Sequence, residues 1–124
     1  MKAILLWFLM FMSFNTYSEE IYRMETKIGN NQFNDLLVID YCKAGVLKGS
    51  VTVPGNFSSP LVGTCHDNIL NFKIVVNENG YTYYVDYMLN SSSNSQETLV
   101  TGKMMSDGVD LGLVQGKRIF RTIL

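Results

Sequence analysis

The residues best suited to chemistry lie in one segment, Cys65-His66-Asp67, with Cys42 as the only other cysteine. A thiolate beside a histidine base is the machinery of nucleophilic catalysis, and all three residue types are common zinc ligands. The spacing suits neither use, because neighbouring side chains in an extended chain point apart and the paired spacings typical of zinc sites are missing. Two cysteines in an exported chain predict instead one disulfide, Cys42–Cys65; the alternatives are two free thiols or half of a metal site.

No other pattern indicates an enzyme. The chain lacks the serine nucleophile motif G-x-S-x-G, a phosphate-binding glycine loop and a dinucleotide fingerprint. Asp40 and Asp86 are each expected opposite a lysine on a neighbouring strand, and Asp107 and Asp110 flank a tight turn, where aspartate is common. We therefore predict a protein that is not an enzyme, with no catalytic residue, no metal ligand and no cofactor.

The start of the chain predicts export. Lys2 is followed by an almost purely apolar run over residues 3–14, too short to span a membrane but typical of a signal peptide. We expect cleavage after Ser18, which makes residues 1–18 a signal peptide, 19–124 a single domain, and the protein periplasmic or secreted; the alternative is an uncleaved N-terminal anchor. The formal net charge of −1 for the whole chain offers no basic surface for nucleic acid. The sequons at Asn56 and Asn90 matter only in a eukaryotic source.

The clearest structural pattern is an antiparallel hairpin over residues 70–89. Asn79-Gly80 is the strongest short signal for a type I′ turn, which needs positive φ at both central residues. A two-residue loop there puts apolar side chains on one face and polar ones on the other. The predicted apolar pairs are Leu70 with Leu89, Phe72 with Tyr87, Ile74 with Val85 and Val76 with Tyr83; the polar pairs are Lys73 with Asp86 and Asn77 with Thr82.

Two further hairpins are predicted in the same way. A three-residue loop, Lys43-Ala44-Gly45, would join strands within residues 35–53, and Asp107-Gly108 would form the last turn. The predicted pairs are Leu37 with Val51, Ile39 with Gly49, Asp40 with Lys48, Tyr41 with Leu47, Met104 with Leu111 and Gly102 with Leu113. Residues 21–28 are predicted to form a first strand with one face exposed to solvent. Residues 29–34, 54–68 and 90–96 are predicted to be loops.

These patterns predict an all-β domain of about eight strands, arranged as a small antiparallel up-and-down barrel; the alternative is a two-sheet β-sandwich. The barrel resembles lipocalin-like and avidin-like barrels in strand count and size, without a shared motif. Gly49 and Gly102 face inward and suggest interior space, although Gly49 could equally mark a bend in its strand.

The aromatic residues suggest binding. Tyr83 and Tyr87 face the interior, whereas Tyr84 projects outward with Val75 and Met88 as an apolar patch. One expectation is an exported binding domain that holds a small apolar or aromatic ligand in a lipocalin-like barrel. The alternative is a protein-interaction module, such as an envelope-associated protein or secreted inhibitor. An apolar cavity above about 300 Å³ would favour the ligand, and a filled core with an exposed Tyr84 patch would favour the interaction module.

Overall fold

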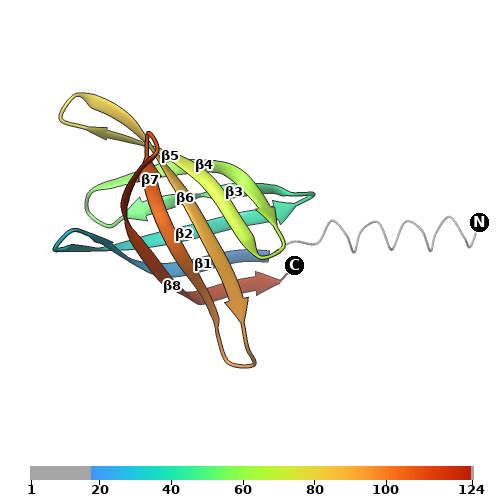
Figure 1. Ribbon diagram of the computed structural model, residues 1–124. Coiled ribbons are helices and arrows are strands. Elements are labelled where there is room, and N and C mark those ends of the chain that lie inside the picture. The colour runs from blue at the N-terminus through green and yellow to red at the C-terminus, as the bar shows by residue number, and fades with distance from the viewer. Residues whose placement is uncertain (1–17, 124) are drawn as a thin grey trace, which may run out of the picture.

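Residues 18–123, which the computed structural model describes, form one closed antiparallel barrel of eight strands (Figure 1). The proposed signal peptide lies outside this range, apart from its last residue. The strands are β1 (Ser18–Ile28), β2 (Asn31–Lys43), β3 (Val46–Val53), β4 (Phe57–His66), β5 (Ile69–Glu78), β6 (Tyr81–Ser93), β7 (Thr98–Ser106) and β8 (Val109–Ile123).

Each strand pairs with the next one along the chain, and β1 pairs with β8 to close the barrel. Closure satisfies hydrogen-bonding groups of both outer strands, so open edges remain among the described strands only where the ladders are short, as in β5 beyond Lys73. The predicted all-β, up-and-down barrel is therefore confirmed over the two-sheet sandwich. No helix that is long and apolar enough to span a bilayer occurs among residues 18–123.

The hairpin of β5 and β6 is confirmed in full. All the predicted pairs, from Leu70 with Leu89 to Asn77 with Thr82, are cross-strand partners, and Asn79 and Gly80 both have positive φ. The buried face includes Phe72 and Tyr87, whose stacked rings have centroids 4.7 Å apart. Alternation and a type I′ turn were sufficient here because both specify the same register.

The β2–β3 hairpin is correct away from its turn and wrong by one residue beside it. Asp40 forms a bulge, so Lys48 faces Tyr41 rather than Asp40. The turn is the two-residue Ala44-Gly45, with positive φ at both positions, and not a three-residue loop. The two-residue turn and the buried middle of the strands require registers that differ by one residue, and the bulge absorbs that extra residue. Leu37 faces Val51 and Ile39 faces Gly49 as predicted, whereas Leu47 faces Cys42 instead of Tyr41.

The last hairpin shows the same kind of shift. Asp107-Gly108 is the turn, but the register slips by one residue between Met104 and Met105. Gly102 therefore faces Val114, not Leu113, and Met104 faces Gly112, not Leu111. The slip buries Val114 and leaves Leu113 67 % exposed.

Most of the segment predicted as a long loop, residues 54–68, is strand β4. Its alternation is clear in the structure, where Ser59, Leu61 and Cys65 are buried. Pro60 has no backbone N–H to donate to a neighbouring strand. This removes no hydrogen bond to β5, because the pairing of β4 with β5 begins only at Val62. The other two predicted loops are also shorter than expected, because β2 begins at Asn31 and β6 continues to Ser93.

The inward glycines do not provide interior space. A Cβ added at Gly49 would collide with the carbonyl oxygen of Val38, and one at Gly102 would collide with that of Met88. These are positions where the backbone of the neighbouring strand approaches closely as the barrel curves, as the bending alternative for Gly49 anticipated. The middle of the barrel is filled by side chains such as Met24, Leu37 and Leu89.

Candidate functional site

The barrel has two ends that differ in chemistry. The disulfide end holds both ends of the described chain and the turns at residues 44–45, 67–68 and 94–97 (Figure 1). The distal end holds the turns at residues 29–30, 54–56, 79–80 and 107–108. Each end is hollowed, and the packed core separates the two hollows.

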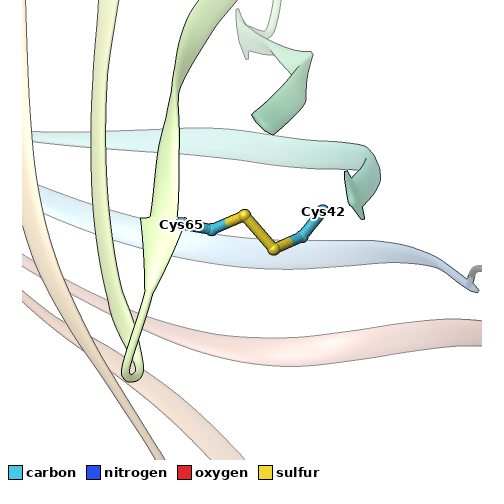
Figure 2. The surroundings of a disulfide bond; sticks show 2 residues. All are labelled: Cys42 and Cys65. Atoms are coloured by element: carbon cyan, nitrogen blue, oxygen red, sulfur yellow. A yellow bond between two sulfur atoms is a disulfide. The ribbon is translucent and has the colours of Figure 1, made fainter. Parts of the chain in front are cut away.

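The predicted disulfide is present at the disulfide end (Figure 2). Cys42 of β2 is bonded to Cys65 of β4, with their Cα atoms 6.2 Å apart, and the bond passes over the end of β3. The backbone N–H of Cys65 also donates to the carbonyl oxygen of Gly45, at 3.1 Å. Because its sulfur is bonded, Cys65 has no thiol to act as a nucleophile with His66. A disulfide of this kind is typical of proteins in oxidising compartments.

His66 Nε2 and a carboxylate oxygen of Asp67 lie 3.0 Å apart, and both side chains are exposed where β4 ends and the next turn begins. Within residues 18–123, no three His, Cys, Asp or Glu side chains come together in a way that could hold a metal ion. The Cys65-His66-Asp67 segment is therefore a structural disulfide followed by a solvated turn.

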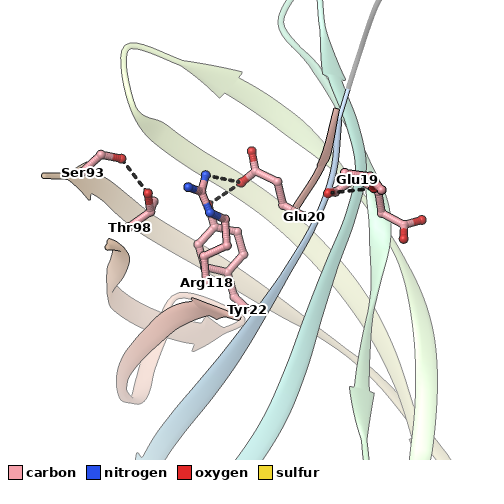
Figure 3. Close-up of polar contacts among 7 residues, drawn as sticks. Glu19, Glu20, Tyr22, Ser93, Thr98 and Arg118 are labelled. Atoms are coloured by element: carbon pink, nitrogen blue, oxygen red, sulfur yellow. Dashed lines mark hydrogen bonds and ion pairs between the residues drawn. The ribbon is translucent and has the colours of Figure 1, made fainter. Parts of the chain in front are cut away.

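The hollow at the disulfide end is wide and polar, with a volume of about 550 Å³. Glu20 is its central polar residue: Tyr22 donates a hydrogen bond to it at 2.5 Å, and Arg118 lies 3.8 Å away (Figure 3). Burial, together with the Glu20 carboxylate, raises the pKa of the Tyr22 hydroxyl. The arginine charge is thus already matched by a carboxylate, and the surroundings are water-accessible rather than apolar.

The hollow at the distal end is a smaller cavity of about 190 Å³ with mainly apolar walls. Its aromatic wall consists of Phe33, Phe57, Tyr83 and Tyr87. Tyr83 stands near the rim, where its hydroxyl donates to Glu78 at 3.0 Å, and Tyr87 is buried deeper against Phe72. This volume is below the value of about 300 Å³ that was expected to favour a ligand, and the middle of the barrel is filled, so the criterion for a drug-sized ligand is not met. The cavity suits only a molecule with a single ring.

One buried carboxylate faces this apolar cavity. Asp35 is only 4 % exposed; one oxygen accepts a hydrogen bond from the Thr26 hydroxyl at 3.0 Å, and the other has no partner within residues 18–123. Burial raises the pKa of Asp35, and the Thr26 hydrogen bond opposes that shift. Burial and the nearby Asp35 charge together raise the pKa of the Tyr87 hydroxyl. Since buried polar atoms are normally satisfied, the free oxygen marks a place where a donor is missing.

The predicted contact residues do not form one site. Tyr83 and Tyr87 line the distal cavity, whereas Tyr84, Val75 and Met88 lie on the outer face of β5 and β6. Tyr84 is 52 % exposed, and the exposed Lys73–Asp86 ion pair, 3.8 Å long, lies between it and Met88 in the register. The outer patch is therefore interrupted by charge, and the Lys73 ammonium lies 5.6 Å from the centre of the Tyr84 ring.

Sequence reasoning did not single out Asp35. The signal was available, because Asp35 precedes Leu37 and Ile39 by two and four residues and so shares their inward face. Asp35 is the first residue of the predicted strand, directly after the loop assigned to residues 29–34, and the predicted pairs gave it no cross-strand partner. Thr26 lies on the predicted inward face of the first strand, and the structure confirms that placement.

No protein-family model matches this chain, and no curated protein or solved structure is significantly similar to it. The functional argument therefore depends on the geometry of the barrel alone.

Proposed function

We propose that this protein is an exported binding domain that holds a small aromatic ligand in the distal cavity. The observation that carries the proposal is the combination of a cavity of about 190 Å³ with four aromatic side chains in its wall. Aromatic rings give a large apolar contact area at low entropic cost, and pockets of this kind are usually already formed before the ligand binds. The disulfide supports export, because such bonds persist in oxidising compartments.

The test is titration of the ¹⁵N-labelled protein with 2-phenylethanol, a neutral molecule with one ring. We expect saturable chemical-shift changes at Phe57 and Tyr83, with the weak affinity typical of a fragment. Leu111→Trp, which fills the cavity, should abolish binding, whereas Leu113→Trp on the outer face of the same strand should not. Absence of saturable shifts, or equal binding by both variants, would overturn the proposal.

The second candidate, a protein-interaction module, is favoured by the exposed apolar side chains of Val62, Tyr84 and Met88. The Lys73–Asp86 ion pair divides this surface, which makes it the weaker candidate. Shift changes confined to these residues on adding a partner protein, with no response to 2-phenylethanol, would favour it.

A further inference from the structure

We infer that the distal cavity selects an organic cation, namely a protonated amine attached to a single aromatic ring, and that Asp35 is the residue that recognises the charge. This inference rests on the proposed function, since it names the class of ligand for the same cavity.

The first argument is the free oxygen of Asp35. Its carboxylate is buried and faces an apolar space; Thr26 donates to one oxygen, and no donor from the described part of the chain reaches the other. A buried carboxylate with an unmet acceptor is costly, and a donor supplied by a ligand removes that cost. An ammonium group has three N–H donors and a positive charge. It can therefore donate a hydrogen bond to the free oxygen and compensate the buried negative charge.

The second argument is the charge balance of the cavity wall. It contains two carboxylates, Asp35 in the interior and Glu78 near the rim, and none of the described residues that line it is Lys, Arg or His. A cation entering the cavity meets no positively charged side chain in the described wall, whereas an anion is repelled by two negatively charged ones. The opposite end of the barrel has mixed charge, with Arg118 and Arg121 in its wall beside the carboxylates Glu20 and Asp67.

The third argument is the nature of the remaining wall. Phe33, Phe57, Tyr83 and Tyr87 surround the space, and aromatic faces attract organic cations as well as apolar rings. A bare metal ion does not fit the donors present, because hard cations need six or more oxygen ligands and these walls are mainly apolar. An amine whose apolar body fills the cavity uses both the carboxylate and the rings.

The experiment compares three probes of similar shape: 2-phenylethylamine, a cation at pH 7, 2-phenylethanol, which is neutral, and 3-phenylpropionate, an anion. An ammonium adds its positive charge to a hydrogen bond with the Asp35 carboxylate, whereas a hydroxyl supplies the hydrogen bond alone. We therefore expect the amine to bind at least about tenfold more tightly than the alcohol. The anion should bind more weakly than either. Calorimetry gives the affinities, and the ¹⁵N spectrum locates each probe.

Asp35→Asn keeps the size of the side chain and an acceptor for Thr26 but removes the charge. We expect it to bring the amine and the alcohol to within about twofold of each other, because the charge attraction that favours the amine is lost. Asp40→Asn is the matched control, because it removes an exposed carboxylate from the same strand, and it should preserve the preference for the amine. Glu78→Gln should reduce that preference only slightly, since Glu78 is exposed to water.

The outcomes separate the two proposals. If amine and alcohol bind equally in the wild type, or if the preference survives in Asp35→Asn, the inference is overturned and the proposed function stands. Tighter binding of the anion at the distal end also overturns the inference. If no probe binds at the distal end, the proposed function itself is wrong.

Discussion

Removal of the Cys42–Cys65 bond would measure how far the barrel depends on its one covalent link. The cysteines are 23 residues apart in the sequence, and the bond joins β2 to β4, two strands that do not pair with each other. In the chain-entropy model, a cross-link of this span lowers the entropy of the unfolded chain by an amount worth about 3.4 kcal/mol at 25 °C. We therefore expect Cys42→Ala/Cys65→Ala to lower the free energy of unfolding by about 3 kcal/mol.

Urea unfolding followed by circular dichroism would test this value. With a slope of about 1–3 kcal/mol per molar urea, the midpoint should fall by roughly 1–3 M, and the slope should rise because the unfolded chain without the cross-link exposes more surface. Cys42→Ala alone, measured in a reducing buffer, should cost nearly as much as the double substitution, because either change removes the bond. A loss below about 1 kcal/mol, or a double variant that costs twice the single one, would refute the reasoning.

The remaining predictions concern the core and the buried carboxylate. Gly102→Ala should lower the free energy of unfolding by about 1–3 kcal/mol, measured in urea, because the new Cβ collides with the Met88 carbonyl; an unchanged midpoint would contradict this. Phe72→Ala should cost about 3–5 kcal/mol by the same measurement, since the ring is buried and stacked on Tyr87; a cost below about 1 kcal/mol would argue against the stack. Asp35→Asn should make the protein more stable than the wild type at pH 7, by about 1 kcal/mol or more. The stability advantage of Asp35→Asn should grow as the pH rises above about 4. Burial raises the pKa of Asp35 in the folded wild type, so the unfolded chain releases this proton at lower pH and the folded state loses stability as the pH rises. A difference in unfolding free energy that does not change with pH would refute the assignment.

The sequence predicts this fold well wherever two independent signals specify the same register. In the β5–β6 hairpin, the Asn79-Gly80 turn and the apolar alternation require the same pairing, so every pair was predicted correctly. In the β2–β3 and β7–β8 hairpins the turn and the buried face require registers that differ by one residue. Bulges at Asp40 and Leu111 let each hairpin keep both its turn and its buried face. No local sequence pattern predicts these bulges, because they depend on how the strands pair in the closed barrel.

The candidate site was harder to predict because its parts come from distant segments. Tyr83 and Tyr87 belong to β6, Phe57 opens β4, and Asp35 lies on β2. Curvature of the sheet brings them to one end, and that curvature depends on close backbone contacts at glycines that the sequence suggested as empty space. The free oxygen of Asp35 is a property of the assembled barrel, since strand pairing alone does not say which donors reach it.

Pairing of the first strand with the last also constrains how the chain can fold while it is being synthesised. Ser18 faces Ile123, so β1 cannot pair fully with β8 until nearly every later residue has been synthesised. Contacts of such long sequence separation form slowly, and until they form both outer strands offer open edges to other chains. A chain interrupted before β8 would form the internal hairpins and still fail to close. The edges of β1 and of the last completed strand therefore stay unpaired until β8 is present.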